Sequence, residues 1–220
     1  MNVLSLFNGM ECASFCLMQA GIPVTKMYAS EIDRFCNTVA RNKWPDTIHV
    51  GCVEELHRDR KDLEWLKSID LVLAGSPCQG FSNAGVGKNF DDPRSRLFFH
   101  FVDILEKIKK HNPNVLFMLE NVRPRKKEWL DAITSYIGVE PVFIDSQVHT
   151  PQMRKRYYWA NWRITQPKPV DIFVADILQA GVDPKYHVSG TRLARLIKEN
   201  PSFNPSKARA LTRNNATSSG

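Results

Sequence analysis

A cysteine and a glutamate each follow an apolar run that is typical of a buried strand. Cys78 comes shortly after residues 71–75, and Glu120 comes directly after residues 115–119. Residues just beyond the carboxyl ends of parallel strands share one edge of the sheet, where ligands bind, so we expect both side chains to face one pocket. A thiol paired with a carboxyl group suits a reaction in which sulfur attacks an electron-poor ring and the acid protonates that ring.

The surroundings of Cys78 favour a catalytic nucleophile over a buried packing residue. Pro77 fixes its own φ and keeps Ser76 extended, which presents the cysteine rigidly. A small buried cysteine is the usual alternative, but the segment Ser76-Pro77-Cys78-Gln79-Gly80 is polar. Three further cysteines fall at helical positions, where we expect them only to pack: Cys12, Cys16 and Cys36.

Glu120 and two arginines add candidate groups for proton transfer and anion binding. A carboxylate at the end of a buried run costs desolvation free energy unless Glu120 has a partner or is protonated. A cap on the following helix is the alternative use for it. Arg154 and Arg156 lie on one side of an extended segment. There they would bind a phosphate or a base and, if near Cys78, favour the ionised form of its thiol. The alternative is that the two arginines belong only to a charged edge strand.

The segment 7–11 follows the first apolar run and opens a helix. Gly9 lets a ligand approach the backbone closely, and the helix N-terminus offers free amides. A plain strand–helix turn explains this segment equally well. Glu31 ends the second apolar run, where an acidic residue commonly binds ribose hydroxyls or caps the next helix. Together these features favour a cofactor that contains a nucleoside.

The first 150 residues alternate short apolar segments with amphipathic ones, which predicts a doubly wound, mostly parallel α/β sheet. Strands are expected over 3–7, 25–29, 47–50, 70–74, 114–119, 141–144 and 156–162. Helices are expected over 11–20, 32–43, 59–67, 94–110, 126–136, 171–179 and 191–198, with a long polar loop over 76–93.

Composition predicts an intracellular globular protein. The 220 residues are 43% apolar and 24% charged, as in ordinary globular proteins. No apolar run approaches the roughly 20 residues of a membrane span, and the first residues do not predict a secretory signal. The five cysteines form no Cys-x-x-Cys pair, so we expect reduced thiols and no metal.

Positive charge is concentrated in the last third of the chain. Residues 1–150 hold 18 Lys+Arg and 19 Asp+Glu, whereas residues 151–220 hold 12 and 4. A basic segment after a neutral one indicates a polyanionic partner such as nucleic acid, or only a solvated basic surface.

Taken in order, these segments resemble the cytosine-5 DNA methyltransferase family. The resemblance covers about residues 3–162 and implies a Rossmann-like catalytic domain over 1–165, with part of a target-recognition region over 166–220. Its most specific marks are Pro77-Cys78, Glu120-Asn121-Val122 and Gln152-x-Arg154-x-Arg156. In the second region, Asp176-Ile177-Leu178 with Tyr186 resembles the start of the target-recognition region.

The resemblance implies that S-adenosylmethionine methylates a cytosine flipped out of duplex DNA. Cys78 would attack C6 while Glu120 holds or protonates N3; C5 would then take the methyl group, and loss of the C5 proton would expel the sulfur. Arg154 and Arg156 would hold the base and an adjacent phosphate. The cofactor contacts that it implies are Phe7, Gly9, Met10, Glu31, Ile32, Cys52, Val53, Ser76, Pro77 and Leu97.

Three departures from the family pattern keep alternatives open. Glu11-Cys12 stands where the family usually has glycines, Cys52 stands where it has an aspartate that accepts from the adenine amine, and a late Gly-Asn segment has no counterpart. These departures allow a non-catalytic DNA-binding subunit of a split enzyme, completed by a second chain. The same chemistry on tRNA is a further alternative to DNA methylation, because the catalytic residues do not separate the two substrates. We expect the protein to be cytoplasmic if it is bacterial or from a phage, and nuclear if it is eukaryotic. The sequence does not identify the DNA sequence that is methylated, nor does it choose between restriction–modification, phage self-protection and gene control as the biological role.

Replacing Cys52 with aspartate should tighten cofactor binding, because a thiol is a poor acceptor for the adenine amine. We expect the dissociation constant for S-adenosylmethionine to fall about tenfold in Cys52→Asp, as one hydrogen bond to a charged acceptor is gained. Isothermal titration calorimetry measures this, and an unchanged constant would reject the idea.

Overall fold

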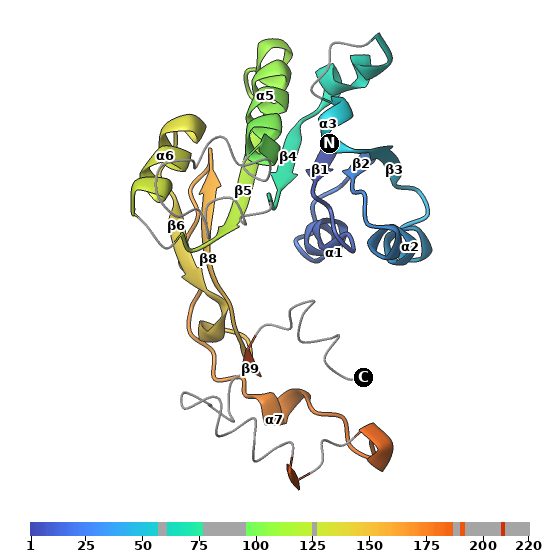
Figure 1. Cartoon of the computed structure of the whole chain (residues 1–220), viewed down its shortest axis with the longest axis vertical. Helices are drawn as coiled ribbons and strands as arrows, with labels where there is room; N and C mark the ends of the chain where they lie inside the picture. The colour runs from blue at the N-terminus through green and yellow to red at the C-terminus, as the bar shows by residue number, and fades with distance from the viewer. Residues whose placement is uncertain (57–60, 77–95, 125–126, 187–189, 192–207, 210–220) are drawn as a thin grey trace. The chain divides into compact units, whose positions relative to one another are not determined.

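The computed structural model describes residues 1–56, 61–76, 96–124, 127–186, 190–191 and 208–209 (Figure 1). Cys78, Pro77 and most of the predicted loop 76–93 and helix 191–198 lie outside the described residues. The chain divides into two compact units. The first unit comprises Met1–Phe143 and Arg156–Ile164, and the second comprises Ile144–Lys155 and Thr165–Gly220.

Seven strands form one sheet in the order β3-β2-β1-β4-β5-β8-β6 (Figure 1). Their bounds are β1 Asn2–Leu6, β2 Lys26–Ser30, β3 Ile48–Gly51, β4 Leu71–Ala74, β5 Leu116–Val122, β6 Val142–Asp145 and β8 Lys155–Ala160. The five strands β1 to β5 pair in parallel, whereas β8 pairs antiparallel to β5. Since β1 lies between β2 and β4, the strand order reverses there, and the predicted doubly wound, mostly parallel fold is confirmed.

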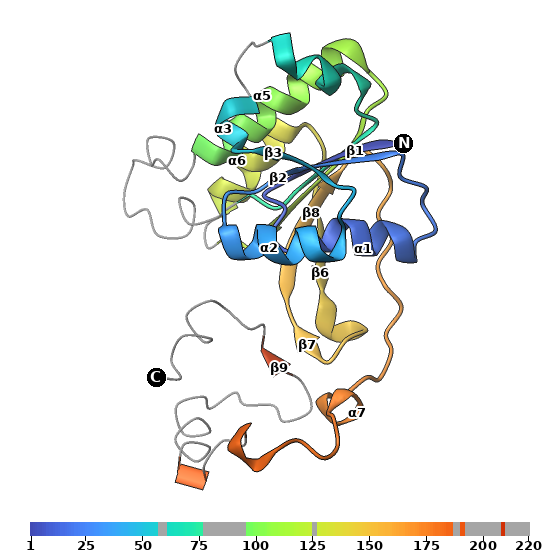
Figure 2. The ribbon, with the colours of Figure 1, turned by 90° about the vertical axis from the view of Figure 1, so that its right-hand side faces the viewer.

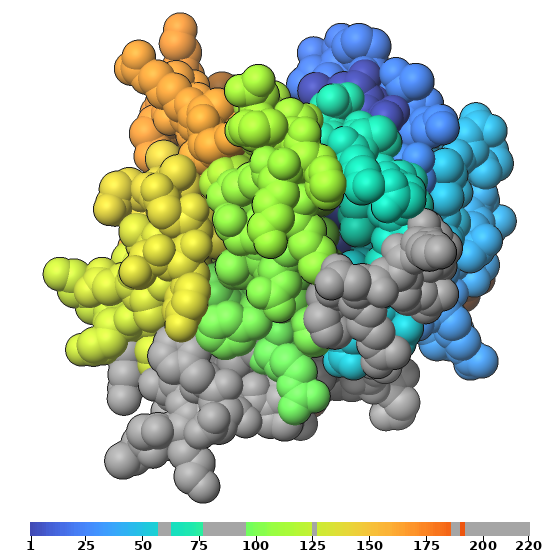
Figure 3. Space-filling model, turned by 90° about the horizontal axis from the view of Figure 1, so that it is seen from above, coloured from blue at the N-terminus to red at the C-terminus, as the bar shows by residue number. Residues whose placement is uncertain are grey.

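Helices cover both faces of this sheet in the first unit. Figure 2 shows α1 (Cys12–Gln19) and α2 (Arg34–Lys43) side by side on one face. The opposite face carries α3 (Val53–Leu56), α5 (Arg96–His111) and α6 (Lys127–Ile137). In the space-filling view of Figure 3, α5 lies between the 3₁₀ segment η1 (Lys61–Ser68) and α6.

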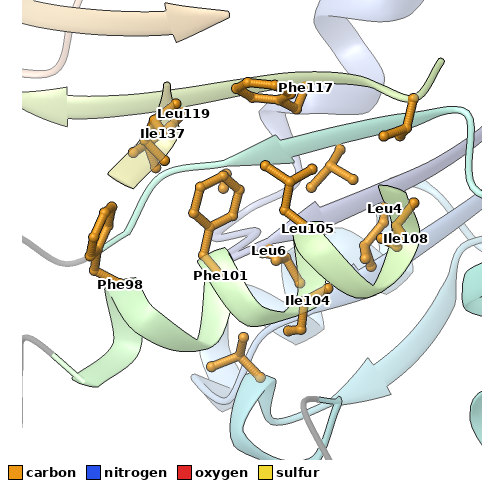
Figure 4. Packing of buried hydrophobic residues seen from close by; sticks show 14 of the residues in the cluster. Leu4, Leu6, Phe98, Phe101, Ile104, Leu105, Ile108, Phe117, Leu119 and Ile137 are labelled. Atoms are coloured by element: carbon orange, nitrogen blue, oxygen red, sulfur yellow. The ribbon is translucent and has the colours of Figure 1, made fainter. Parts of the chain in front are cut away.

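Helix α5 supplies much of the main core because its apolar residues recur every three to four positions. Phe98, Phe101, Ile104, Leu105 and Ile108 are all buried. Figure 4 shows these side chains packed toward the sheet residues Leu4, Leu6, Phe117 and Leu119. This packing fixes the strands whose carboxyl ends carry the candidate site.

In the first unit, three elements differ from the sequence prediction in extent, type or presence. Strand β5 continues three residues further than expected, to Val122, because β8 pairs with its last residues. The segment expected as an α-helix over 59–67 is the 3₁₀ segment η1 in its described part. The short helix α3 was not predicted, since its four residues, Val53–Leu56, are too few to show a helical pattern.

The second unit contains short elements only, within its described residues. They are η2 Ser146–Val148, β7 Gln152–Met153, α7 Val174–Ile177, η3 Pro184–Tyr186 and β9 Ala208–Arg209, with β7 parallel to β9. Helix α7 lies inside the predicted helix 171–179. In the part of the chain that the structure describes, no helix combines the length and the apolar character needed to cross a membrane.

Truncating the core of α5 should destabilise the fold strongly. Phe101 is fully buried, so we expect Phe101→Ala to lower the free energy of unfolding by about 3–5 kcal/mol. Phe35→Ala is the matched control, because Phe35 is 65% exposed and its loss should cost less than about 1 kcal/mol. Denaturant titration measures both, and equal effects would contradict the packing described.

Candidate active site at the carboxyl edge of the sheet

The strand register brings the predicted site residues to one edge. Leu6 of β1 pairs with Ser30 of β2 and with Ala74 of β4, and Ala74 pairs in turn with Leu119 of β5. The residue after each of these four therefore lies in the next row of the same edge. These residues are Phe7, Glu31, Gly75 and Glu120.

The loop after β1 has the open backbone that the sequence suggested. Phe7 and Gly9 both adopt positive φ, at 57° and 56°. A Cβ atom on Gly9 would meet no heavy atom within 4 Å, so the backbone there is accessible. Asn8 donates its backbone N–H to the Ser30 carbonyl at 3.0 Å, and its buried side-chain Oδ1 has no hydrogen-bond partner. An unpartnered acceptor at this point fits a ligand that carries a hydroxyl or an ammonium group.

Glu31 connects the loops after β1 and β2. Its Oε2 accepts from the N–H of Gly9 at 2.8 Å, and its Oε1 accepts from the N–H groups of Ile32 and Asp33, also at 2.8 Å. The alternative that Glu31 caps α2 is wrong, because Asp33 caps this helix by accepting from Phe35 and Cys36. A carboxylate accepts about four hydrogen bonds, so Glu31 retains one position for a ribose hydroxyl.

The other predicted cofactor residues divide by exposure. Met10 and Ile32 are 57% and 76% exposed, so their apolar side chains are available to a ligand. Val53 is buried in the main core and Leu97 packs against that core. Cys52 is half-buried and directly follows β3, whose last residue, Gly51, accepts from the Ser30 hydroxyl at 2.8 Å.

Asn121 holds the segment that leads to Cys78. Its buried side-chain amide donates to the Ser76 hydroxyl at 3.1 Å and to the Ser76 carbonyl at 3.3 Å. Ser76 is itself buried and immediately precedes Pro77-Cys78, which lie outside the described residues. The sequence points to Asn121 only as part of the mark Glu120-Asn121-Val122 and gives it no role; its buried amide next to Glu120 is the available signal.

Glu120 lies within β5 and is paired with an arginine of β8. Arg156 Nε lies 2.6 Å from Glu120 Oε1, and the two side chains are only 17% and 24% exposed. A methyl group built on Gly75 would lie 3.6 Å from Glu120 Oε2, so the carboxylate sits beside the chain that leaves β4. The helix-cap alternative for Glu120 is wrong, since α6 begins only at Lys127.

Arg154 belongs to the second unit, whereas Glu120 and Arg156 belong to the first. The backbone of Arg154 is fixed within its own unit, where its N–H donates to Asp145 Oδ1 at 3.1 Å and its carbonyl accepts from Ser146. Its side chain is exposed.

The expectation that the helical cysteines only pack is wrong for two of them. Cys12 and Cys16 of α1 are exposed, while Cys36 of α2 is half-buried, and none of these three or Cys52 is in a disulfide. The sequence pattern failed here because α1 presents little of its surface to the sheet, with Leu17 as its buried residue.

The profile of the family described as C-5 cytosine-specific DNA methylase matches residues 1–214, nearly the whole chain. The chain belongs to this family. The resemblance drawn from Pro77-Cys78, Glu120-Asn121 and the two arginines is thereby confirmed.

Curated relatives within the C-5 cytosine-specific DNA methylases include bacterial and phage proteins. The Type II methyltransferase M1.ScrFI of Lactococcus lactis subsp. cremoris is 30% identical over 76% of this chain and 46% of its own length. The Type II methyltransferase M.NlaX of Neisseria lactamica is 30% identical over 85% of this chain and 62% of its own. The orphan methyltransferase M.SPRI of Bacillus phage SPR is 26% identical over 90% of this chain and 54% of its own length. The chain thus spans about half the length of these relatives.

Solved structures of the same fold include two Dnmt2 proteins. The S. pombe Dnmt2 methyltransferase matches with a TM-score of 0.68 at 17% identity, over 99% of this chain and 72% of that one. The Spodoptera frugiperda DNMT2 mutant matches with a TM-score of 0.63 at 19% identity, over 94% and 68%. At these identities the likeness shows the fold alone.

The link between Asn121 and Ser76 should be measurable as an energetic coupling. We expect Asn121→Ala and Ser76→Ala to interact by about 1 kcal/mol in a double-mutant cycle of unfolding free energies, because each removes one partner of the same bond. Asn114→Ala is the matched control, since Asn114 is exposed and should show no coupling to Ser76→Ala. Additive effects of Asn121→Ala and Ser76→Ala would contradict the contact.

Proposed function

We propose that the protein methylates C5 of cytosine in duplex DNA with S-adenosylmethionine, through a covalent bond between Cys78 and C6. The observation that carries this proposal is the position of the Glu120-Asn121 pair. Asn121 binds Ser76, two residues before Cys78, while Glu120 lies beside Gly75 in the same strand edge. The topology therefore brings the Glu120 carboxyl group next to the start of the segment that contains Cys78.

Two residues would act on the cytosine ring, and two arginines would position the reacting groups. The Cys78 thiolate adds to C6 of the flipped base, while the Glu120 carboxyl group, in its protonated form, donates a hydrogen bond or its proton to N3, so that negative charge does not build up on the ring. When C5 has taken the methyl group, a base removes the C5 proton, and the electron pair returns to the ring and expels the sulfur. Arg156 holds Glu120 in place through their ion pair, and Arg154 would bind a phosphate or the base.

S-adenosylmethionine, when bound, supplies the electrophilic methyl group. The loop of residues 7–11 would hold its polar end, where Gly9 is open and Asn8 Oδ1 lacks a partner. Glu31 would bind the ribose hydroxyls, and the exposed side chain of Ile32 would lie against the adenine. The remaining expected contacts, including Ser76, Leu97 and Val53, would act mainly by shaping this edge, because their side chains are buried or pack against the core.

Duplex DNA is favoured as the substrate over tRNA. The matched family is described by its action on DNA, and the basic surplus of residues 151–220, 12 Lys+Arg against 4 Asp+Glu, suits a polyanion. We assign catalysis to residues 1–165 and part of target recognition to residues 166–220. Such an enzyme would work where the DNA is, in the cytoplasm of a bacterial cell, as the bacterial and phage relatives suggest.

A second chain would cover an apolar surface on one face of the sheet. The chain spans about half of its curated relatives, from 46% to 62% of the three described. On the sheet face that carries α1, Phe15 and Met18 are 50% and 52% exposed, and Leu116 of β5 is 38% exposed. Leu116 faces this side because its neighbour Phe117 packs into the core on the other side. Apolar side chains on a parallel sheet are normally covered on both faces.

Covalent trapping on duplex DNA that contains 5-fluorocytosine tests the proposal. Fluorine at C5 blocks the last elimination, so with S-adenosylmethionine present we expect a denaturation-resistant adduct that peptide mapping assigns to Cys78. Cys78→Ala should form no adduct and no methylated product, yet bind the cofactor as the unchanged protein does. Cys16→Ala is the matched control, because Cys16 is an exposed thiol of α1 and its loss should leave trapping intact.

Each other outcome of the trapping experiment identifies an alternative. An adduct on tRNA but none on DNA would assign the same chemistry to the other substrate. Bound DNA without an adduct would support the non-catalytic or split-enzyme alternative. Full methyl transfer by Cys78→Ala would remove the covalent mechanism.

A further inference from the structure

Glu11 stands at an unusual point of the chain, directly before α1. It is fully buried, at 0% exposure, and adopts the left-handed backbone conformation, with φ of 66° and ψ of 44°. A side chain other than glycine is strained there, and a buried carboxylate adds a desolvation cost. Two unfavourable features at one residue indicate that the carboxylate has a specific use.

The Glu11 carboxylate connects three segments. Its Oε1 accepts from the Thr47 hydroxyl at 2.5 Å and from the Ser14 hydroxyl at 2.7 Å, and its Oε2 lies 3.4 Å from the donating side-chain amide of Asn8. These donors are uncharged, and among the described residues Glu11 forms no ion pair. Its backbone N–H donates to the Asn8 carbonyl at 3.1 Å, which closes the turn of the loop.

His49 does not neutralise this carboxylate. Burial lowers the pKa of His49, the positive charge of Arg41 lowers it further, and the negative charge of Glu11 opposes both effects. His49 Nδ1 is within 3.1 Å of Asn37 Oδ1, and its buried Nε2 has no partner. The imidazole is therefore favoured in its neutral form near neutral pH, and the hydroxyls and amide carry the stabilisation of Glu11.

We propose that Glu11 is a positioning residue for the cofactor, which fixes the loop of residues 7–11 against the segment that enters β3. This inference rests on the proposed function, because that loop and Cys52, at the end of β3, are the two flanks of the proposed cofactor site. Thr47 directly precedes β3, the strand that leads to Cys52, so its bond to Glu11 holds the loop of residues 7–11 against the start of that strand before the ligand arrives. The side chain thereby offsets the absence of the glycine that the family usually has here.

Cofactor titration of three variants tests the assignment. We expect Glu11→Gly to weaken binding of S-adenosylmethionine about tenfold, because the backbone stays permissive while the bonds to Thr47 and Ser14 are lost. Glu11→Gln keeps an acceptor oxygen and should stay within about threefold of the unchanged protein. Thr47→Val should reproduce most of the loss and serves as the second variant if Glu11→Gly folds poorly. Thr38→Val is the matched control, since the exposed Thr38 hydroxyl bonds only within α2, to the Arg34 carbonyl.

The readouts separate positioning from simple stabilisation. Calorimetry gives the dissociation constant for the cofactor, and in an active preparation the KM for the cofactor should rise while kcat and the KM for DNA stay unchanged. Variants that lower the melting temperature of the free protein but leave cofactor affinity unchanged would overturn the assignment, as would equal losses in Thr38→Val and Thr47→Val. An unchanged protein that binds no S-adenosylmethionine would overturn the proposed cofactor and this inference with it, whereas normal affinity in Glu11→Gly and Thr47→Val would overturn this inference alone.

Discussion

The register of β1, β4 and β5 is the constraint on which the site depends. Because parallel strands pair with fixed spacing of about 4.8 Å, the pairings of Leu6 with Ala74 and of Ala74 with Leu119 set where each following loop begins. Buried side chains of α5 hold these strands from one face. A slip of one residue in β5 would turn Glu120 to the opposite face and bring Asn121 to its place.

Polar side chains then hold the loops in place, where the sheet no longer does. Glu31 fixes Gly9, Asn121 fixes Ser76, and Glu11 fixes the start of α1 to Thr47. Each bond joins a loop at the carboxyl edge to a neighbouring strand or loop, and most of these groups are buried or half-buried. Buried polar groups that are fully paired specify one geometry, which is what a site needs in order to bind a ligand without first rearranging.

The antiparallel strand β8 supplies the cation that pairs with Glu120. It pairs Val122 with Arg156 and Glu120 with Tyr158, so Arg156 lies diagonally across from Glu120 on the same face of the sheet. That geometry allows the ion pair between two largely covered side chains. A half-buried carboxylate thereby gains its partner from a strand more than thirty residues away in sequence.

The sequence by itself determined the alternation of strands and helices, the parallel sheet and the candidate groups Cys78, Glu120 and Arg156, because hydrophobic period and local motif are properties of short segments. The tertiary structure alone decided which groups meet. It extended β5 through Glu120, left Cys12 and Cys16 exposed, and buried Glu11 against Thr47. Each of these depends on contacts between segments far apart in the chain, and a pattern read along one segment carries no information about its distant neighbours.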